Sequence, residues 1–96
     1  MDTVWEMAVI VRIPTPFQYV TGGQETVEAG PDSIAGLIVQ LDRLYPGISE
    51  KLTEKGKLRS YVNILVNDTD IRFLQGEDTE ISDGDEVTIV PAIAGG

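Results

Sequence analysis

The chain has 96 residues, which fits a single domain, and its 16 acidic side chains against seven basic ones give a net charge of −9. That charge repels nucleic acid and favours a protein partner with a basic docking surface; on a plainer interpretation it only keeps the protein soluble. Cys and His are absent, which excludes disulfides, thiolate metal sites and the usual nucleophile–base pairs. No stretch approaches the roughly 20 apolar residues of a membrane span, and residues 1–6 carry acid where an export signal carries base, so we expect a cytoplasmic protein.

The first expected element is a strand at 4–13, where the residues alternate between two faces with a period of two. Pro14 and Pro16 end its pairing, because proline has no N–H to donate to a sheet. The glycines of 21–23 predict a turn, after which 24–28 returns as the second strand of a hairpin. The residues on the predicted inner face of the first strand are Met7, Val9, Val11 and Ile13.

A helix is expected next. The segment 30–33 predicts its start, with Asp32 or Ser33 as the residue that caps the free amides of the first turn. Gly36 weakens the helix by roughly 1 kcal/mol relative to Ala, and Pro46-Gly47 ends it. The apolar residues follow one another at spacings of three and four and form one stripe, which consists of Ile34, Leu37, Ile38, Leu41, Leu44 and Tyr45.

The second half of the chain is predicted to supply the rest of the sheet. The elements expected there are a helical turn at 48–52, a loop at 54–57, a strand at 61–66, a turn at 67–70, a short hairpin partner at 71–74, a loop at 76–80, a turn at 81–85 and a last strand at 86–90.

This order predicts an α+β domain with the ubiquitin-like β-grasp architecture, a mixed sheet of four to five strands packed on one main helix. Its first and last strands would lie side by side and parallel. The domain is expected at 1–91 and a flexible C-terminal tail at 92–96. The sheet residues expected to face the helix stripe are Val9, Val11, Val62, Ile64, Val87 and Ile89.

The tail is the strongest candidate site. A carboxylate that enters the narrow active site of another enzyme needs a slim approach, and glycine has no Cβ to obstruct it. Gly95 and Gly96 are therefore the candidate reactive end, and Ala92, Ile93 and Ala94 are candidate partner contacts. The alternative interpretation is a frayed end or a cloning scar.

Other sites are weakly supported. The D-x-D spacings at 68–70 and 83–85 lack the ligand series of a calcium loop and are better explained as turns, so we expect no metal. No group of side chains suggests a catalytic centre, and we expect no enzyme activity. Among the aromatic residues, most of which should pack in the core, Phe73 in the short strand at 71–74 is the candidate exposed anchor for a partner.

The order of elements and the ending at 90–96 resemble the MoaD/ThiS family of sulfur carriers, ubiquitin-like β-grasp proteins that end in Gly-Gly. The resemblance spans nearly the entire chain and is greatest to those members that serve cysteine biosynthesis. The segments that carry it are 13–15, 21–24, 62–64, 66–68, 70–73 and 83–85.

The resemblance implies a mechanism in which partner enzymes do the chemistry. A MoeB/ThiF-like adenylating enzyme would use ATP to convert the Gly96 carboxylate to an acyl-adenylate, and the carrier itself would bind no cofactor. Sulfide or a sulfurtransferase would then supply sulfur to form a thiocarboxylate. A sulfur-accepting enzyme would take the sulfur, a cysteine synthase by the first interpretation.

Three alternatives stay open at this point. The chain would be the small subunit of molybdopterin synthase, working with the large subunit of that enzyme. It would be a ubiquitin-like modifier, joined through Gly96 to a lysine of a target. Or it would be a plain β-grasp binding module with an inert tail.

Overall fold

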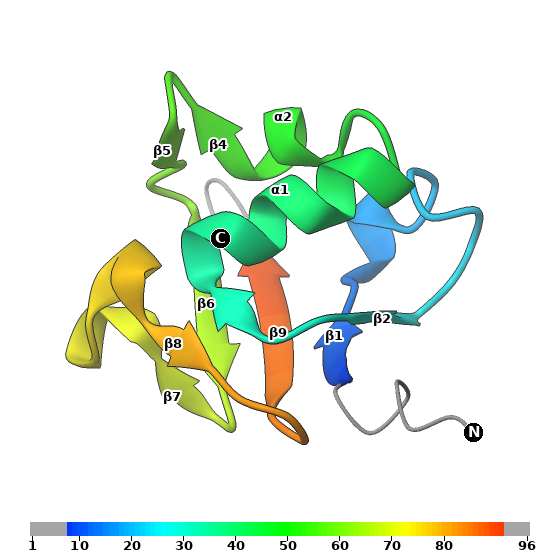
Figure 1. Ribbon diagram of the computed structural model, residues 1–96. Helices are drawn as coiled ribbons and strands as arrows, with labels where there is room; N and C mark the ends of the chain where they lie inside the picture. Colours follow the sequence, from blue (N-terminus) through cyan, green and yellow to red (C-terminus); the bar gives the residue numbers. More distant parts are fainter. Residues whose placement is uncertain (1–7, 92–96) are drawn as a thin grey trace, which may run out of the picture.

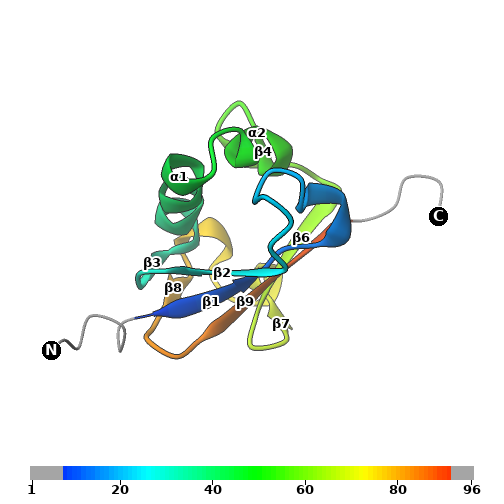
Figure 2. The same cartoon turned by 90° about the vertical axis from the view of Figure 1, so that its right-hand side faces the viewer.

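The computed structural model describes residues 8–91, and the rest of the chain lies outside this description. Its centre is a five-stranded mixed sheet in the order β2-β1-β9-β6-β7. Figure 1 shows the main helix α1 running across the sheet with the short helix α2 next to it, and Figure 2 shows that both lie over the same face. The predicted α+β β-grasp architecture, with one main helix on a mixed sheet, is therefore confirmed. The bounds are β1 Val9–Arg12, β2 Thr26–Ala29, α1 Ile34–Leu44, α2 Ile48–Leu52, β6 Val62–Val66, β7 Thr69–Asp70 and β9 Glu86–Pro91.

The opening strands form the expected hairpin, with β1 and β2 antiparallel from the pair Val9–Ala29 to the pair Arg12–Thr26. The first and last strands are parallel neighbours, as predicted, because β9 inserts between β1 and β6. Short elements complete the domain. They are η2 Thr15–Phe17, β3 Asp32–Ser33, β4 Thr53–Glu54, β5 Lys57–Leu58, η3 Ile71–Phe73, η4 Gly76–Asp78 and β8 Glu80–Ile81.

The core lies between the helices and the covered face of the sheet. Every sheet residue predicted to face the helix is buried, and so are Ile34, Leu37, Ile38 and Leu41 of the stripe. Leu44 was expected to extend that stripe and does not, since its side chain is 57% exposed. The helix ends at this residue, and the next one to pack against the core is its C-cap, Tyr45.

Ser33 is the N-cap of α1, because its Oγ accepts the N–H of Gly36 at 3.1 Å. Asp32, the other candidate, instead accepts the N–H of Ser33 at 2.7 Å. The Asp32 carboxylate lies over the first turn, where a Cβ on residue 36 would collide with it. The glycine that weakens the helix in isolation therefore makes room for the residue before the cap.

Two segments predicted as loops are ordered. Residues 54–57 belong to a small hairpin in which β4 pairs with β5, and its turn is Lys55-Gly56 with φ of 54° and 80°. Residues 76–80 contain η4 and the start of β8, which pairs with β3 beside the start of α1. The last strand runs one residue further than the predicted range 86–90, to Pro91.

The predicted hairpin partner of β6 was wrong by two residues. The strand that pairs with β6 is Thr69–Asp70, and residues 71–74, predicted as that strand, begin with the 3-10 turn η3. Asn67 and Asp68 both have left-handed φ, 50° and 74°, and together form a two-residue hairpin turn. Such a turn brings the residues on either side of it into register at once. The pairing therefore begins at residue 69, and it ends at Asp70 because that residue caps the 3-10 turn η3.

Candidate functional site

The candidate reactive end, Gly95-Gly96, and the candidate partner contacts Ala92, Ile93 and Ala94 all lie outside the described residues. So does the expected tail at 92–96. What the structure describes is the root of this segment, the strand β9 that ends at Pro91, and the surface around it.

The end of β9 is held on one side only. Its pairing with β1 stops at the pair Arg12–Thr88, whereas its pairing with β6 continues to the pair Val62–Pro91. The first half of β9 is therefore fixed between two strands, and its last three residues lie against β6 alone.

Two prolines explain this asymmetry. The N–H of Ile10 donates to the Asp85 carbonyl at 3.1 Å. The backbone N–H and C=O groups of every second residue after Ile10, residue 14 included, therefore point toward β9. Pro14 has no N–H to continue the ladder, and its carbonyl accepts the Phe17 N–H at 2.9 Å as the chain turns into η2. The backbone nitrogen of Pro91 points to the side of β9 from which β1 has turned away, so its lack of an N–H breaks no strand pairing. The sequence signal for this end was thus present in Pro14 and in Pro91.

A groove opens where β1 leaves, with a volume of about 410 Å³. We call it the β1-side groove. Its walls are mostly polar: the Gln18 side chain donates to the Ile13 carbonyl at 3.0 Å, and Arg12 forms an ion pair with Glu86. It is lined by residues 12–15 together with Gln18, Glu25, Thr88 and Ile89.

A second groove, of about 330 Å³, lies on the other flank of β6, and we call it the β6-side groove. Aliphatic side chains from three different elements line it, among them Leu58, Ile64 and Ile71. Sequence reasoning missed both grooves, since each is formed where segments distant in the chain come together. The β6-side groove is lined by residues 58–60, 62–64 and 70–72 together with Gly76 and Glu77.

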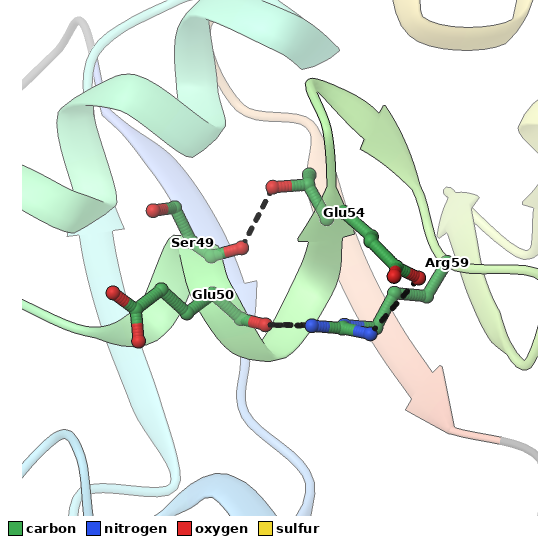
Figure 3. A network of polar contacts seen from close by, with 5 residues as sticks. Ser49, Glu50, Glu54 and Arg59 are labelled. Atoms are coloured by element: carbon green, nitrogen blue, oxygen red, sulfur yellow. Dashed lines mark hydrogen bonds and ion pairs between the residues drawn. The ribbon is translucent and has the colours of Figure 1, made fainter.

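Arg59 fixes one wall of the β6-side groove. It donates from Nε and Nη2 to the Glu50 carbonyl, at 3.1 and 2.9 Å, and pairs through Nη1 with Glu54 at 3.4 Å (Figure 3). Thr53 Oγ1 also donates to the Ser49 carbonyl at 2.8 Å. The end of α2 and the small hairpin are thereby fastened to the segment that leads into β6.

Phe73 lies beside this groove, directly after Ile71 and Arg72 of its wall. Its side chain is 83% exposed, as expected of a partner anchor, although it stands on η3 and not on a strand. Phe17 and Tyr45 pack against the core as predicted, but Tyr19 and Tyr61 are exposed. The expectation that most aromatic residues pack in the core is therefore wrong for residues 8–91. Leu74 is exposed as well.

The acidic turns have structural roles. Asp70 caps η3 by accepting the Arg72 N–H at 2.8 Å and also binds the Arg72 guanidinium, whose hydrogen bonds hold the pKa of Asp70 below its ordinary value. Asp85 accepts from the Ser82 N–H at 2.8 Å and from Asn67 Nδ2 at 2.9 Å. In residues 8–91 no three acidic side chains form a group that would hold a metal ion.

The Lys51 side chain lies over an aromatic ring. Its Nζ lies 5.5 Å from the centre of the Tyr19 ring, and interaction with this side chain raises the pKa of Lys51. A raised pKa keeps the amine protonated, which is the reverse of what a nucleophilic lysine needs. As for a membrane, none of the helices between residues 8 and 91 is long and apolar enough to span one.

Comparison with known proteins gives consistent matches along the chain. A profile described as the ThiS family matches residues 11–96. The sequence is 50% identical over 93 residues to the sulfur carrier protein CysO of Mycobacterium tuberculosis, which covers 94% of this chain and 100% of that protein.

Solved structures agree with the sequence matches. A chain in the Amycolatopsis orientalis BexX/CysO complex superposes with a TM-score of 0.88 at 42% identity, over 93% of this chain and 100% of that one. The Methanosarcina acetivorans small archaeal modifier protein 1 superposes with a TM-score of 0.80 at 27% identity, over 93% and 96% of the two chains.

Proposed function

Because the chain belongs to the ThiS family, we propose that it is a sulfur carrier whose C-terminal Gly96 carboxylate is converted to a thiocarboxylate. The observation that carries the proposal is the 50% identity to a sulfur carrier protein over 94% of the chain. The lack of Cys and His agrees with it, since a carrier needs no catalytic side chain of its own.

The proposed chemistry has two steps, both on a partner enzyme. A Gly96 carboxylate oxygen attacks the α-phosphorus of ATP, the bond to the β-phosphate breaks, and pyrophosphate leaves. The resulting acyl-adenylate has a good leaving group, which the free carboxylate lacks. Sulfide then attacks the carbonyl carbon and AMP departs, which leaves the thiocarboxylate. Where the sulfur comes instead as a protein persulfide, its attack gives an acyl disulfide; a second thiol then attacks the donor's own sulfur, forms a disulfide with it and releases the thiocarboxylate. A MoeB/ThiF-like adenylating enzyme suits the first step and sulfide or a sulfurtransferase the second.

The fold suits a protein that presents its end to others. Sheet pairing fixes β9 on both sides as far as Thr88, so the root of the terminal segment has a defined position and direction. Beyond Thr88 one side of the strand is open, and a partner can approach it there. This chain supplies the binding surface and the length of its terminal segment. The partner enzyme supplies the acid, the base and the metal ion that the reaction needs.

For the sulfur acceptor we propose an enzyme of cysteine biosynthesis, such as a cysteine synthase, on the basis of the similarity to CysO. The small-subunit role in molybdopterin synthase has no comparable support. The genes that neighbour this one would separate the two acceptors.

A second candidate function is a ubiquitin-like protein modifier, joined through Gly96 to a lysine. It is favoured by the structural similarity to small archaeal modifier protein 1. It would use the same acyl-adenylate, with a lysine amine in place of sulfur as the nucleophile.

Intact-mass spectrometry of the protein isolated from its native host tests both candidates. Replacement of one oxygen by one sulfur supports the carrier role. A series of conjugates with other proteins supports the modifier role. An unmodified mass, together with no change after incubation with ATP, sulfide and adenylating enzyme, would contradict both.

A further inference from the structure

We propose that Phe73 and the β6-side groove together form the docking site for the adenylating enzyme, whose own contribution is an apolar side chain next to a carboxylate. This inference rests on the proposed function and adds to it the surface that the enzyme grips outside the terminal segment.

Phe73 is exposed on a turn that is firmly held. The side chain of Ile71 is buried beneath it, and the Leu74 N–H donates to the Ile71 carbonyl at 2.9 Å. Asp70 caps the turn at its start, and the Gln75 N–H donates to the buried Thr79 Oγ1 at 3.0 Å after its end. The aromatic ring is therefore presented on an ordered backbone, which lowers the entropy lost when a partner binds it.

The position of the groove relative to the terminal segment points to an enzyme that takes up that segment. Val62, in the groove wall, is the pairing partner of Pro91, so the groove is about one strand spacing, roughly 4.8 Å, from the root. The five residues from 92 to 96 span at most about 17 Å when fully extended. An enzyme that buries Gly96 must then also contact the surface around Pro91, where Tyr61 and Val90 are exposed as well.

The chemistry of the groove specifies what would enter it. Its aliphatic walls suit an apolar side chain, and Arg72 at its edge supplies a cation that is 67% exposed. Nε and Nη2 of Arg72 bind Asp70, while in the described part of the chain Nη1 has no hydrogen-bond partner. A guanidinium with a free Nη binds a carboxylate well, so at this one position the enzyme segment should carry Asp or Glu beside its apolar residue. Around that position the acidic surface of the chain, including Glu77 of the groove, still favours basic residues on the enzyme.

The first test measures carrier-dependent ATP–pyrophosphate exchange by a MoeB/ThiF-like adenylating enzyme at varied carrier concentration. In Phe73→Ala the KM for the carrier should rise about tenfold or more with kcat within twofold, as for a buried aromatic anchor. Leu44→Ala is the matched control, an exposed apolar residue at the end of α1, and should leave KM within twofold. Thermal melting of both variants checks that the fold is intact.

The second test reverses one charge. Arg72→Glu should raise the KM for the carrier by about tenfold, whereas Arg43→Glu, an exposed arginine on α1, should change it less than twofold. If wild type supports exchange and both Phe73→Ala and Arg72→Glu match it in KM, the docking inference is wrong and the proposed function stands. If wild type supports no exchange, the proposed function fails, and the inference with it.

Discussion

Between α1 and the sheet the apolar side chains are almost completely buried, and Leu41 of the helix is only 1% exposed. Beside the β6-side groove the same fold leaves an aromatic residue, Phe73, 83% exposed on an ordered turn. The first region holds the domain together through burial. The second is anchored to the core through buried residues such as Ile71 but holds the Phe73 side chain outside it, so that side chain is free to meet a partner. Substitutions should therefore separate the two regions, with loss of stability in one and loss of transfer in the other.

The largest effect is expected at the terminus itself. Deletion of Gly96 moves the carboxylate back by roughly 3.3–3.6 Å, and a displacement near 1 Å already costs about a hundredfold in rate. Sulfur transfer should therefore be abolished while the free energy of unfolding stays unchanged. One residue added after Gly96 should block transfer as well. Time-resolved intact-mass analysis of the three forms measures this, and equal rates would mean that the terminus is not the reactive group.

In the buried region, Leu41→Ala should lower the free energy of unfolding by roughly 2–5 kcal/mol, because the substitution leaves a cavity between helix and sheet. Leu44→Ala, one turn further along α1, should change it by less than about 0.5 kcal/mol. Urea denaturation of both variants gives the comparison. Similar losses from the two leucines would contradict the division between buried and exposed positions on this helix.

A smaller effect is expected at the helix cap. Ser33→Ala removes the oxygen that accepts the Gly36 N–H and should cost about 1 kcal/mol of stability. Ser33→Asp retains an acceptor and should stay within a few tenths of a kcal/mol of wild type. A Ser33→Ala protein as stable as wild type would show that the cap is dispensable.

The smallest effect concerns acid stability. Asp42 accepts the N–H groups of Ser49 and Gly47, each at 3.1 Å, and the bond from Ser49 is the main cause that lowers the pKa of Asp42. Because the pKa is lower in the folded chain, the unfolded chain binds more protons between the two values, and stability falls as pH drops below about 4. Asp42→Asn should show a shallower loss between about pH 5 and about pH 3. Identical denaturation profiles in the two proteins would contradict this role.

The covered region could be predicted from sequence because burial leaves a regular pattern. Val9 and Val11 repeat at period two, and Leu37 and Leu41 at helical spacing, so the sheet face and the helix stripe followed directly. Leu44 broke the pattern only because the helix ends there.

The β6-side groove and the end of β9 were harder to predict. Residues 71–74 have the composition of a strand, but the two-residue turn at Asn67-Asp68 had already fixed which residues pair, and Asp70 then caps a 3-10 turn. The β6-side groove depends on β5, β6 and η3 meeting in space, which no local pattern records. Pro14 and Pro91 did carry a local signal, yet its meaning required knowing that β1 and β9 are neighbours.

The most direct test of the central claim is to locate the sulfur within the chain. The protein would be incubated with ATP, a sulfur source and the adenylating enzyme, and then fragmented in the mass spectrometer. The chain contains no Cys, so no side-chain thiol competes for the assignment. We predict that the replaced oxygen is found only in C-terminal fragments that contain Gly96. Sulfur gained in any fragment that ends before Gly96 would contradict the account.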